Sequence, residues 1–330
     1  MKQRNLSLSF WFLIFVSGCG CFIQLNESIK VSTIGERRDA TFEEGALIES
    51  KHISCITFGF PKRTVNEIDI INDWWHTGLQ YVRKGELSFL ESEALEMHRD
   101  LIHDVESQQV SGMLFECGVA KGGSSLLLSI VKHPNRCLHL FDTFQGMPKP
   151  SAADGPDVHE RYKVIQDGKA GKNYYGYMKN LQQVVKMHID KAGNNSTVYL
   201  HKGLFADTVW PVGPVAYAHL DGDWYESTIG MLERVHPFIS IGGYMVLDDV
   251  EHFSGSRKAL ADFFNFDVDL WLDQVKTFRA NGDRSKCRAQ HEGISYSLEL
   301  RSRVVAKKMG EGGAEHEMKL CASKVTNAGA

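Results

Sequence analysis

Two short acidic motifs in the second half of the chain carry residue types that bind cations and move protons. Asp221 and Asp223 directly follow one apolar run, and Asp248 and Asp249 directly follow the next. Neighbouring parallel strands end at the same edge of a sheet, so we expect these four carboxylates to converge. So many anions would repel one another and destabilise the fold unless a cation lay among them.

The ligand chemistry of this group indicates a hard ion such as Mg²⁺, because all the donors are oxygens and no Cys/His cluster competes for that role. Asp221, Asp248 and Asp249 fit as ligands, which leaves Asp223 as the candidate general base. The alternative interpretation is that these aspartates only cap helices at two strand–helix junctions.

A glycine-rich turn upstream has the composition of a cofactor site. Residues 115–125 pass from a predicted strand into a predicted helix through Gly118, Gly122 and Gly123. Glycine lets a ligand approach the backbone, and the helix N-terminus supplies free N–H groups. The spacing is neither GxGxxG nor GK[ST], so it does not indicate pyrophosphate binding. Asp142 ends the next predicted strand, where a carboxylate can accept both hydroxyls of a ribose; together these features predict a nucleoside cofactor. A merely tight turn and a surface aspartate remain the alternatives.

The elements that must position these residues follow from hydrophobic patterning. From residue 112 onward, short apolar runs alternate with helical patterns, and strands buried on both faces predict a doubly wound, mostly parallel α/β sheet. Alternation over 293–305 predicts a closing antiparallel strand. The predicted strands are 113–117, 137–141, 198–201, 215–220 and 244–247, and the predicted helices are 124–133, 178–189, 226–235 and 257–264.

Two further segments flank this pattern. Ser88 to Glu91 forms a capping box that predicts a helix start, followed by an apolar stripe for packing on the sheet. The stripe comprises Leu90, Ala94, Met97, Leu101 and Val105. Residues 143–177 are poor in apolar side chains and leave the carboxyl end of the second strand, so we interpret them as a lid, with a passive insertion as the alternative.

The N-terminus resembles a targeting segment. Lys2 and Arg4 precede the uncharged apolar run 8–23. An uncleaved type II membrane anchor, a cleaved signal peptide and a bacterial lipoprotein modified at Cys19 all fit this pattern. The predicted location is therefore the secretory-pathway lumen or its membrane, with a cleaved secreted form or a lipoprotein as alternatives.

The predicted organisation is a signal or anchor segment (1–24), a stem and helical N-terminal cap (25–85), a catalytic domain (86–305) and a polar tail (306–330). The net charge of −4 over 330 residues provides no basic field, so we expect no nucleic-acid partner. Cys55, Cys287 and Cys321 form a disulfide or stay free according to the compartment. The sequence is compatible with a homo-oligomer.

Five stretches together resemble the macrocin O-methyltransferase (TylF-type) family of sugar O-methyltransferases. They are FECGVAKGGSS at 115–125, LFDTFQGMPKP at 140–150, KGLFADT at 202–208, LDGDWYEST at 220–228 and GGYMVLDDV at 242–250. The resemblance covers about residues 85–265 and leaves out the N-terminus, the stem and the tail.

This resemblance implies a Rossmann-like class I methyltransferase fold with a seven-stranded sheet, and S-adenosyl-L-methionine and Mg²⁺ as cofactors. The acceptor would be a hydroxyl of a sugar, glycan or glycoside. Cofactor contacts would come from Glu116, Gly118, Gly122, Gly123, Ser124, Asp142 and Asp221. Asp221, Asp248 and Asp249 would hold the metal, with Asp223 as the base. The alternatives are a lumenal DxD glycosyltransferase and a non-catalytic binding protein with the same fold.

Overall fold

An eight-stranded sheet organises the residues that the computed structural model describes, which are 64–193, 195–211, 213–279, 286–309 and 321. The strand order is β3-β2-β1-β4-β5-β8-β7-β6. The first five strands in this order pair in parallel, and the pairs β5–β8, β8–β7 and β7–β6 are antiparallel. The strands are β1 (Met113–Cys117), β2 (Leu138–Asp142), β3 (Val198–Lys202), β4 (Val215–Leu220), β5 (Ile239–Leu247), β6 (Lys286–His291), β7 (Ile294–Leu300) and β8 (Val304–Lys308).

The predicted doubly wound, mostly parallel α/β fold is confirmed, but the predicted count of seven strands is wrong. The segment 293–305, predicted as one closing strand, contains β7 and only the start of β8, and a turn at 301–303 separates the two strands. The predicted start of the tail at residue 306 falls inside β8. β8 is short and ends in two lysines, and its partner β5 lies far away in sequence, so local patterning did not reveal it.

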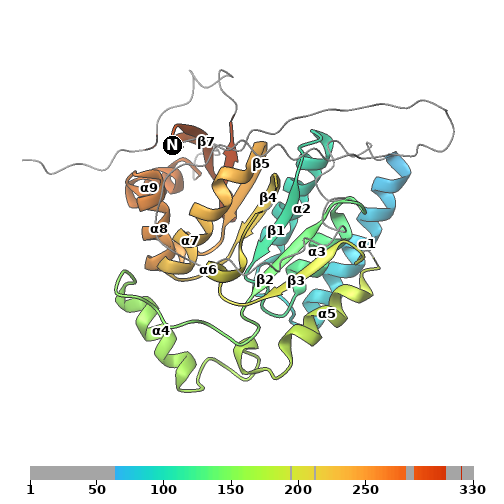
Figure 1. The fold of residues 1–330 in the computed structure, drawn as a ribbon, viewed down its shortest axis with the longest axis horizontal. Coiled ribbons are helices and arrows are strands. Elements are labelled where there is room, and N and C mark those ends of the chain that lie inside the picture. The colour runs from blue at the N-terminus through green and yellow to red at the C-terminus, as the bar shows by residue number, and fades with distance from the viewer. Residues whose placement is uncertain (1–63, 194, 212, 280–285, 310–320, 322–330) are drawn as a thin grey trace, which may run out of the picture. The chain divides into compact units, whose positions relative to one another are not determined.

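Helices cover both faces of the sheet (Figure 1). One layer comprises α1 (Val65–Lys84), α2 (Ser92–Ser107), α3 (Gly123–Val131) and α5 (Leu181–Lys191), and the other comprises α7 (Tyr225–Val235), α8 (Ser254–Phe264) and α9 (Val268–Arg279). Each face has its own hydrophobic core: in β1, Leu114 belongs to one and Phe115 to the other. Burial on both faces explains why the parallel strands read as unbroken apolar runs.

Five further elements complete the described fold. The helix α4 (Pro156–Gln166) lies beyond one end of the sheet and contacts α8 of one helix layer (Figure 1). The remaining elements are α6 (Phe205–Thr208) and three 3₁₀ turns, η2 (Tyr175–Tyr177), η3 (His236–Phe238) and η4 (Asp249–Glu251). α4 and η2 both belong to the segment 143–177 that was interpreted as a lid.

The N-terminal helices begin elsewhere than predicted. The capping box lies at the start of α1, where the Thr64 side chain accepts from the Glu67 backbone and Glu67 accepts from the Thr64 backbone. α2 begins at Ser92, and Ser88 accepts a hydrogen bond from the Leu90 backbone N–H instead of capping the helix. The predicted cap at Ser88 is therefore wrong, whereas the predicted apolar stripe of α2 is buried throughout.

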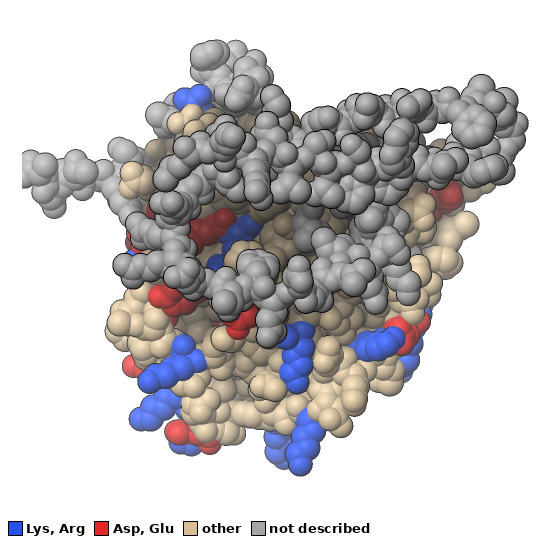
Figure 2. All heavy atoms as spheres, viewed as in Figure 1, with Lys and Arg blue, Asp and Glu red and all other residues tan. Residues whose placement is uncertain are grey.

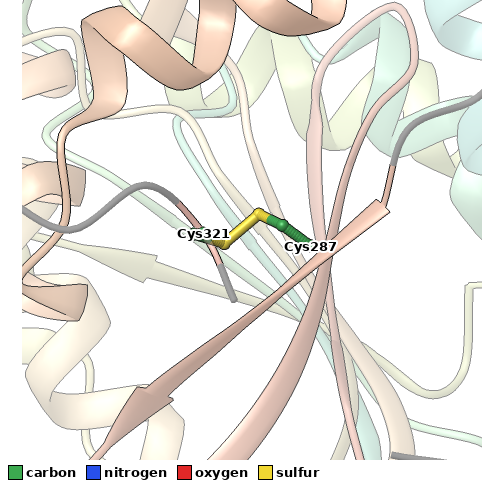
Figure 3. The surroundings of a disulfide bond; sticks show 2 residues. All are labelled: Cys287 and Cys321. Atoms are coloured by element: carbon green, nitrogen blue, oxygen red, sulfur yellow. A yellow bond between two sulfur atoms is a disulfide. The ribbon is translucent and has the colours of Figure 1, made fainter. Parts of the chain in front are cut away.

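A disulfide joins Cys287 in β6 to Cys321, with their Cα atoms 4.9 Å apart (Figure 3). The Cys321 backbone N–H also donates to the carbonyl of Arg288, at 3.0 Å. Cys55 lies outside the described residues, as do the predicted anchor 8–23 and nearly all of the tail. Within the described ranges, no helix has the length and apolar character that a bilayer crossing needs.

Candidate active site

A cavity of about 480 Å³ opens at the edge of the sheet where β1, β2, β4 and β5 end. Ligand sites in open α/β sheets occupy this edge, and the volume is typical of a small-molecule site. Most of the predicted site residues line the cavity: Gly118, Ser124, Asp142, Asp221, Asp223, Asp248 and Asp249. The structure therefore brings the glycine turn and both acidic motifs together, as the strand pattern predicted.

The glycine turn after β1 packs directly against the loop that carries Asp221. Gly118 has φ +98°, and a Cβ there would lie 2.1 Å from the Asp221 carbonyl oxygen, so no larger residue fits. Asp142 Oδ2 accepts hydrogen bonds from the backbone N–H groups of Val119 and Ala120, at 2.8 and 3.0 Å. Its Oδ1 accepts from the Phe144 N–H at 2.7 Å. Asp142 thus fixes the turn between β1 and α3 as well as facing the cavity.

Three of the predicted cofactor residues are not among those that line the cavity: Glu116, Gly122 and Gly123. Glu116 is fully buried in β1, where Ser125 donates to it and His219 Nδ1 lies 3.5 Å from its Oε1. A Cβ on Gly123 would lie 2.6 Å from the Leu87 carbonyl oxygen. Gly123 therefore allows the turn to pack closely against the backbone of Leu87. Direct contact between the cofactor and Glu116, Gly122 or Gly123 stays a prediction.

The carboxylates of Asp221, Asp223 and Asp249 form a compact group whose ligand atoms all lie within 4.8 Å of one another. Burial, with the charge of Asp223 beside it, raises the pKa of Asp221 to about 8. Burial also raises the pKa of Asp249 well above its ordinary value, and the neighbouring Asp221 adds to this. Such a group is stable in ionised form only with a cation, so its chemistry fits the predicted hard divalent ion.

Asp223 has a strained backbone, with φ +56° in the left-handed region. Burial and the charge of Asp249 raise the pKa of its carboxyl well above the ordinary value, while the Arg161 guanidinium opposes this shift. Strained residues of this kind cluster at functional sites, because the surrounding fold must hold them in place. The role of Asp223 as general base stays a prediction.

Asp248 has a partner that the sequence did not predict. Its carboxylate pairs with the guanidinium of Arg303, which stands in the turn between β7 and β8, and Arg303 Nη2 lies 3.0 Å from Glu91 Oε2. Asp248 also has a ligand atom within 4.8 Å of those of His219 and Asp221, so its role as a metal ligand stays a prediction. Arg303 had no sequence signal, because only the insertion of β8 beside β5 brings it to this edge.

The segment 143–177 covers the cavity and is fastened to the first residues of two helices. Asp154 Oδ1 accepts from the Tyr225 N–H at the start of α7, at 2.8 Å, and Asp157 Oδ2 accepts from the Ser254 N–H at the start of α8, at 2.9 Å. Arg161 of α4 lines the cavity. These contacts agree with the lid interpretation, and the low apolar content of the segment was the signal for it.

The surface outside the cavity carries mixed charge. On the described part of the face in Figure 2, Lys and Arg side chains stand among Asp and Glu. This distribution is consistent with the small net charge of the sequence.

The fold and the site define a Rossmann-like α/β domain with a glycine turn and a half-buried acidic group at one sheet edge. The sequence profile of the macrocin-O-methyltransferase (TylF) family matches residues 64–271, and the chain belongs to this family. The predicted resemblance is therefore confirmed.

Two curated relatives are each 30% identical to the chain. One is the Streptomyces niveus demethyldecarbamoylnovobiocin O-methyltransferase, aligned over 57% of this chain and 71% of its own. The other is the Streptomyces olivaceus 8-demethyl-8-(2,3-dimethoxy-alpha-L-rhamnosyl)-tetracenomycin-C 4'-O-methyltransferase, over 49% and 61%. The chain thus spans about three fifths of the tetracenomycin enzyme. The solved O-methyltransferase NovP matches at 21% identity with a TM-score of 0.49, over 68% of this chain and 83% of its own.

The relatives correct one prediction. Both are methyltransferases of Streptomyces, a bacterium without a secretory-pathway lumen. The predicted location in that lumen, or in its membrane through a type II anchor, is therefore wrong. The apolar run 8–23 itself lies outside the described residues, so the cleaved-signal and lipoprotein alternatives stay predictions.

Proposed function

We propose that this protein is an S-adenosyl-L-methionine- and Mg²⁺-dependent O-methyltransferase that acts on a sugar hydroxyl of a glycoside. The observation that carries the proposal is the half-buried acidic group beside the glycine turn, in a chain of the TylF family. The names of the relatives support a glycoside acceptor, because the methyl groups they transfer go to rhamnosyl, novobiocin and mycinamicin compounds.

In this proposal, different residues of the chain bind the methyl donor, bind the ion and accept the proton. Gly118, Ser124 and Asp142 hold the methyl donor at the turn after β1. When bound, the donor supplies an electrophilic methyl group and Mg²⁺ supplies the positive charge that makes a sugar hydroxyl more acidic. Asp221 and Asp249 hold the ion, and Asp223 accepts the hydroxyl proton on its carboxylate.

The remaining side chains of the cavity position the acceptor and exclude water. Asp248 and Arg303 close one side of the acidic group, and Arg161 faces it from the lid. Trp224 is buried below the lid and donates its indole N–H to the Pro148 carbonyl, at 2.9 Å. Holding donor and acceptor together in this enclosed space supplies much of the rate.

The test is the variant Asp223→Asn, assayed for methyl transfer from S-adenosyl-L-methionine to a panel of deoxysugar glycosides with and without Mg²⁺. Loss of a general base typically costs about 10²–10⁴-fold in rate, so we expect kcat to fall by that factor. Calorimetric titration with S-adenosyl-L-homocysteine should show unchanged cofactor affinity. Asp207→Asn makes the same change on an exposed residue of α6 and should leave both measurements unchanged.

Two results would contradict the proposal. One is full activity of the wild type after exhaustive chelation, which would remove the metal from the reaction. The other is tight binding of a nucleotide sugar in place of the adenosyl ligands, which would indicate the DxD glycosyltransferase alternative.

A further inference from the structure

A second cluster of metal-ligating side chains lies away from the active site, at the opposite end of β5. His236 belongs to η3, immediately before β5 begins, whereas Asp248 follows its last residue. A nine-residue strand separates these two points by roughly 30 Å. His291 and Glu292 come from the end of β6 and the turn that follows it. Both lie beyond the residues that match the family.

The ligand atoms of this cluster are close enough to share one ion. One nitrogen of each histidine and one oxygen of Glu292 all lie within 4.8 Å of one another. His236 Nε2 is 3.6 Å from Glu292 Oε2, and the rings of His236 and His291 are perpendicular with centroids 4.7 Å apart. Ligands at 2.0–2.1 Å from a tetrahedral Zn²⁺ lie about 3.3 Å from each other. Only a small movement would therefore bring these groups onto one ion.

The hydrogen bonds of the histidines leave their metal-facing nitrogens as acceptors. His291 Nδ1 lies 2.5 Å from the Phe263 carbonyl oxygen, so Nδ1 donates to it and Nε2 is the nitrogen left for an ion. Metal-ligating histidines typically donate their other N–H to a carbonyl in this way. The 3.6 Å between His236 Nε2 and Glu292 Oε2 is too long for a hydrogen bond.

The ring of His236 lies between two polar partners. Its Nε2 faces Glu292, and on the other side of the ring the Tyr296 hydroxyl lies 3.5 Å from Nδ1. An imidazole nitrogen and a carboxylate oxygen therefore face each other, and a cation between them would satisfy both.

The surrounding structure fixes these side chains in place. His291 stacks on Phe263, with ring centroids 3.7 Å apart and an angle of 15° between the planes. Glu292 and Gly293 form the two-residue turn between β6 and β7, with φ +48° and +80°, as type I′ hairpins require. This turn places Glu292 next to His291 and opposite His236. Glu292 is 73% exposed, which gives an ion access from solvent and room for water as a further ligand.

We propose that His236, His291 and Glu292 form a second metal site, selective for a divalent transition ion of the zinc type. Two imidazoles and one carboxylate are borderline ligands that suit Zn²⁺, whereas Mg²⁺ prefers oxygen ligands alone. The ion ties the β6–β7 hairpin to the start of β5. It is chemically distinct from the ion of the acidic group and takes no part in methyl transfer.

The experiment is a calorimetric titration of the chelated full-length chain with Zn²⁺, in excess Mg²⁺ and without reductant. The Mg²⁺ occupies the acidic group, and the intact Cys287–Cys321 disulfide keeps those sulfurs from binding zinc. We expect one equivalent of Zn²⁺ to bind and to raise the melting temperature. His291→Phe keeps the ring on Phe263 but removes the ligand, and Glu292→Gln removes the charge. Each should weaken Zn²⁺ binding by at least the roughly 10–100-fold that loss of a ligand's hydrogen-bond partner typically costs.

The matched control is His76→Phe, which replaces an exposed histidine of α1 and should bind Zn²⁺ like the wild type. Circular dichroism establishes that each variant is folded. Absence of a Zn²⁺ equivalent in the wild type would overturn the proposal, as would undiminished binding in both His291→Phe and Glu292→Gln. Methyl transfer should be equal in the wild type and the two variants, so a failure of the proposed enzyme activity leaves this test intact.

Discussion

At the scale of single residues, the pairing of Arg303 with Asp248 decides how the acidic site behaves without the proposed ion. Both side chains are at least nine-tenths buried, and the guanidinium is the positive charge closest to Asp248 among the described ion pairs. Removing one partner of a buried pair leaves the other charge uncompensated. Arg303 therefore stabilises the site before any cation has bound.

We predict that Arg303→Met lowers the free energy of unfolding by about 3 kcal/mol in the absence of divalent ions. Mg²⁺ should recover part of this loss, because the ion offers Asp248 a new counter-charge. The rise in melting temperature on adding Mg²⁺ should thus be larger in Arg303→Met than in the wild type. Arg99→Met, which breaks an exposed pair with Asp100, is the control. Equal Mg²⁺-induced shifts in both proteins would refute this role.

His98 makes the stability of the fold depend on pH. Burial lowers its pKa well below the ordinary value of 6.5, and the charges of His219 and Arg303 add to this. Its Nδ1 bonds the Tyr217 hydroxyl within the core. Below pH 6.5 the unfolded chain takes up a proton that folded His98 does not bind, so the free energy of unfolding falls as the pH drops.

We therefore expect His98→Phe to flatten this dependence. Relative to the wild type, the slope should change by up to about 1.4 kcal/mol per pH unit below pH 6.5. Urea unfolding at several values between pH 7 and pH 5 measures it, and the slope is informative even if the substitution shifts the overall stability. His76→Phe should keep the wild-type slope. Parallel curves for His98→Phe and wild type would contradict the assignment.

At the scale of elements, the segment 143–177 depends on two aspartates that cap other helices. Asp154 and Asp157 accept the first N–H groups of α7 and α8, which otherwise lack partners within their helices. The Ser254 hydroxyl also bonds Asp157, at 2.5 Å. These hydrogen bonds thus link the segment 143–177 to α7 and α8, the helices that follow the two acidic loops.

Asp157→Ala should weaken this fastening by about 1 kcal/mol, the usual contribution of a capping side chain. We expect faster amide exchange and faster proteolysis across 143–177, together with a several-fold higher KM for the acceptor. Asp167→Ala changes an exposed aspartate at the other end of α4 and serves as the control. If both variants exchanged at the wild-type rate, the segment would be held by other contacts.

The sequence predicted those elements best whose burial in the fold is visible as a local pattern of apolar residues. The parallel strands were recognisable because burial on both faces imposes unbroken apolar runs, and the acidic residues because they follow such runs. α1 was predicted only as part of a helical cap over 25–85, without its bounds, because its first half leaves the apolar side chains Val65, Ile68 and Ile70 exposed. These residues form no single buried stripe, so the capping box at Thr64 was not recognised as a helix start. β8 and Arg303 were missed because strand pairing across a long separation has no local signature.

At the scale of the whole molecule, the disulfide secures the C-terminal part of the sheet. Cys287 and Cys321 are 34 residues apart, and β7 and β8 lie within the loop they close. Cross-linking a loop of this length restricts the unfolded chain and typically stabilises a fold by about 3–4 kcal/mol. A covalent bond thus stabilises β6, β7 and β8, the antiparallel strands that follow the residues matching the family.

We predict that the double variant Cys287→Ser/Cys321→Ser loses about 2–4 kcal/mol of unfolding free energy under non-reducing conditions. The double change avoids an unpaired thiol and leaves Cys117, which is buried and free, as it was. Guanidinium unfolding of both proteins measures the difference. Identical midpoints would show that the bond adds nothing to stability.

The position of β8 also has a consequence for synthesis on the ribosome. β8 is the last strand of the described sheet in sequence, yet it lies inside the sheet between β5 and β7. At roughly 5–20 residues per second, β5 emerges several seconds before the strand that covers it. During that interval its edge is open to other chains and Asp248 has not yet met Arg303. The nascent protein therefore needs protection from aggregation until its final strand has been made.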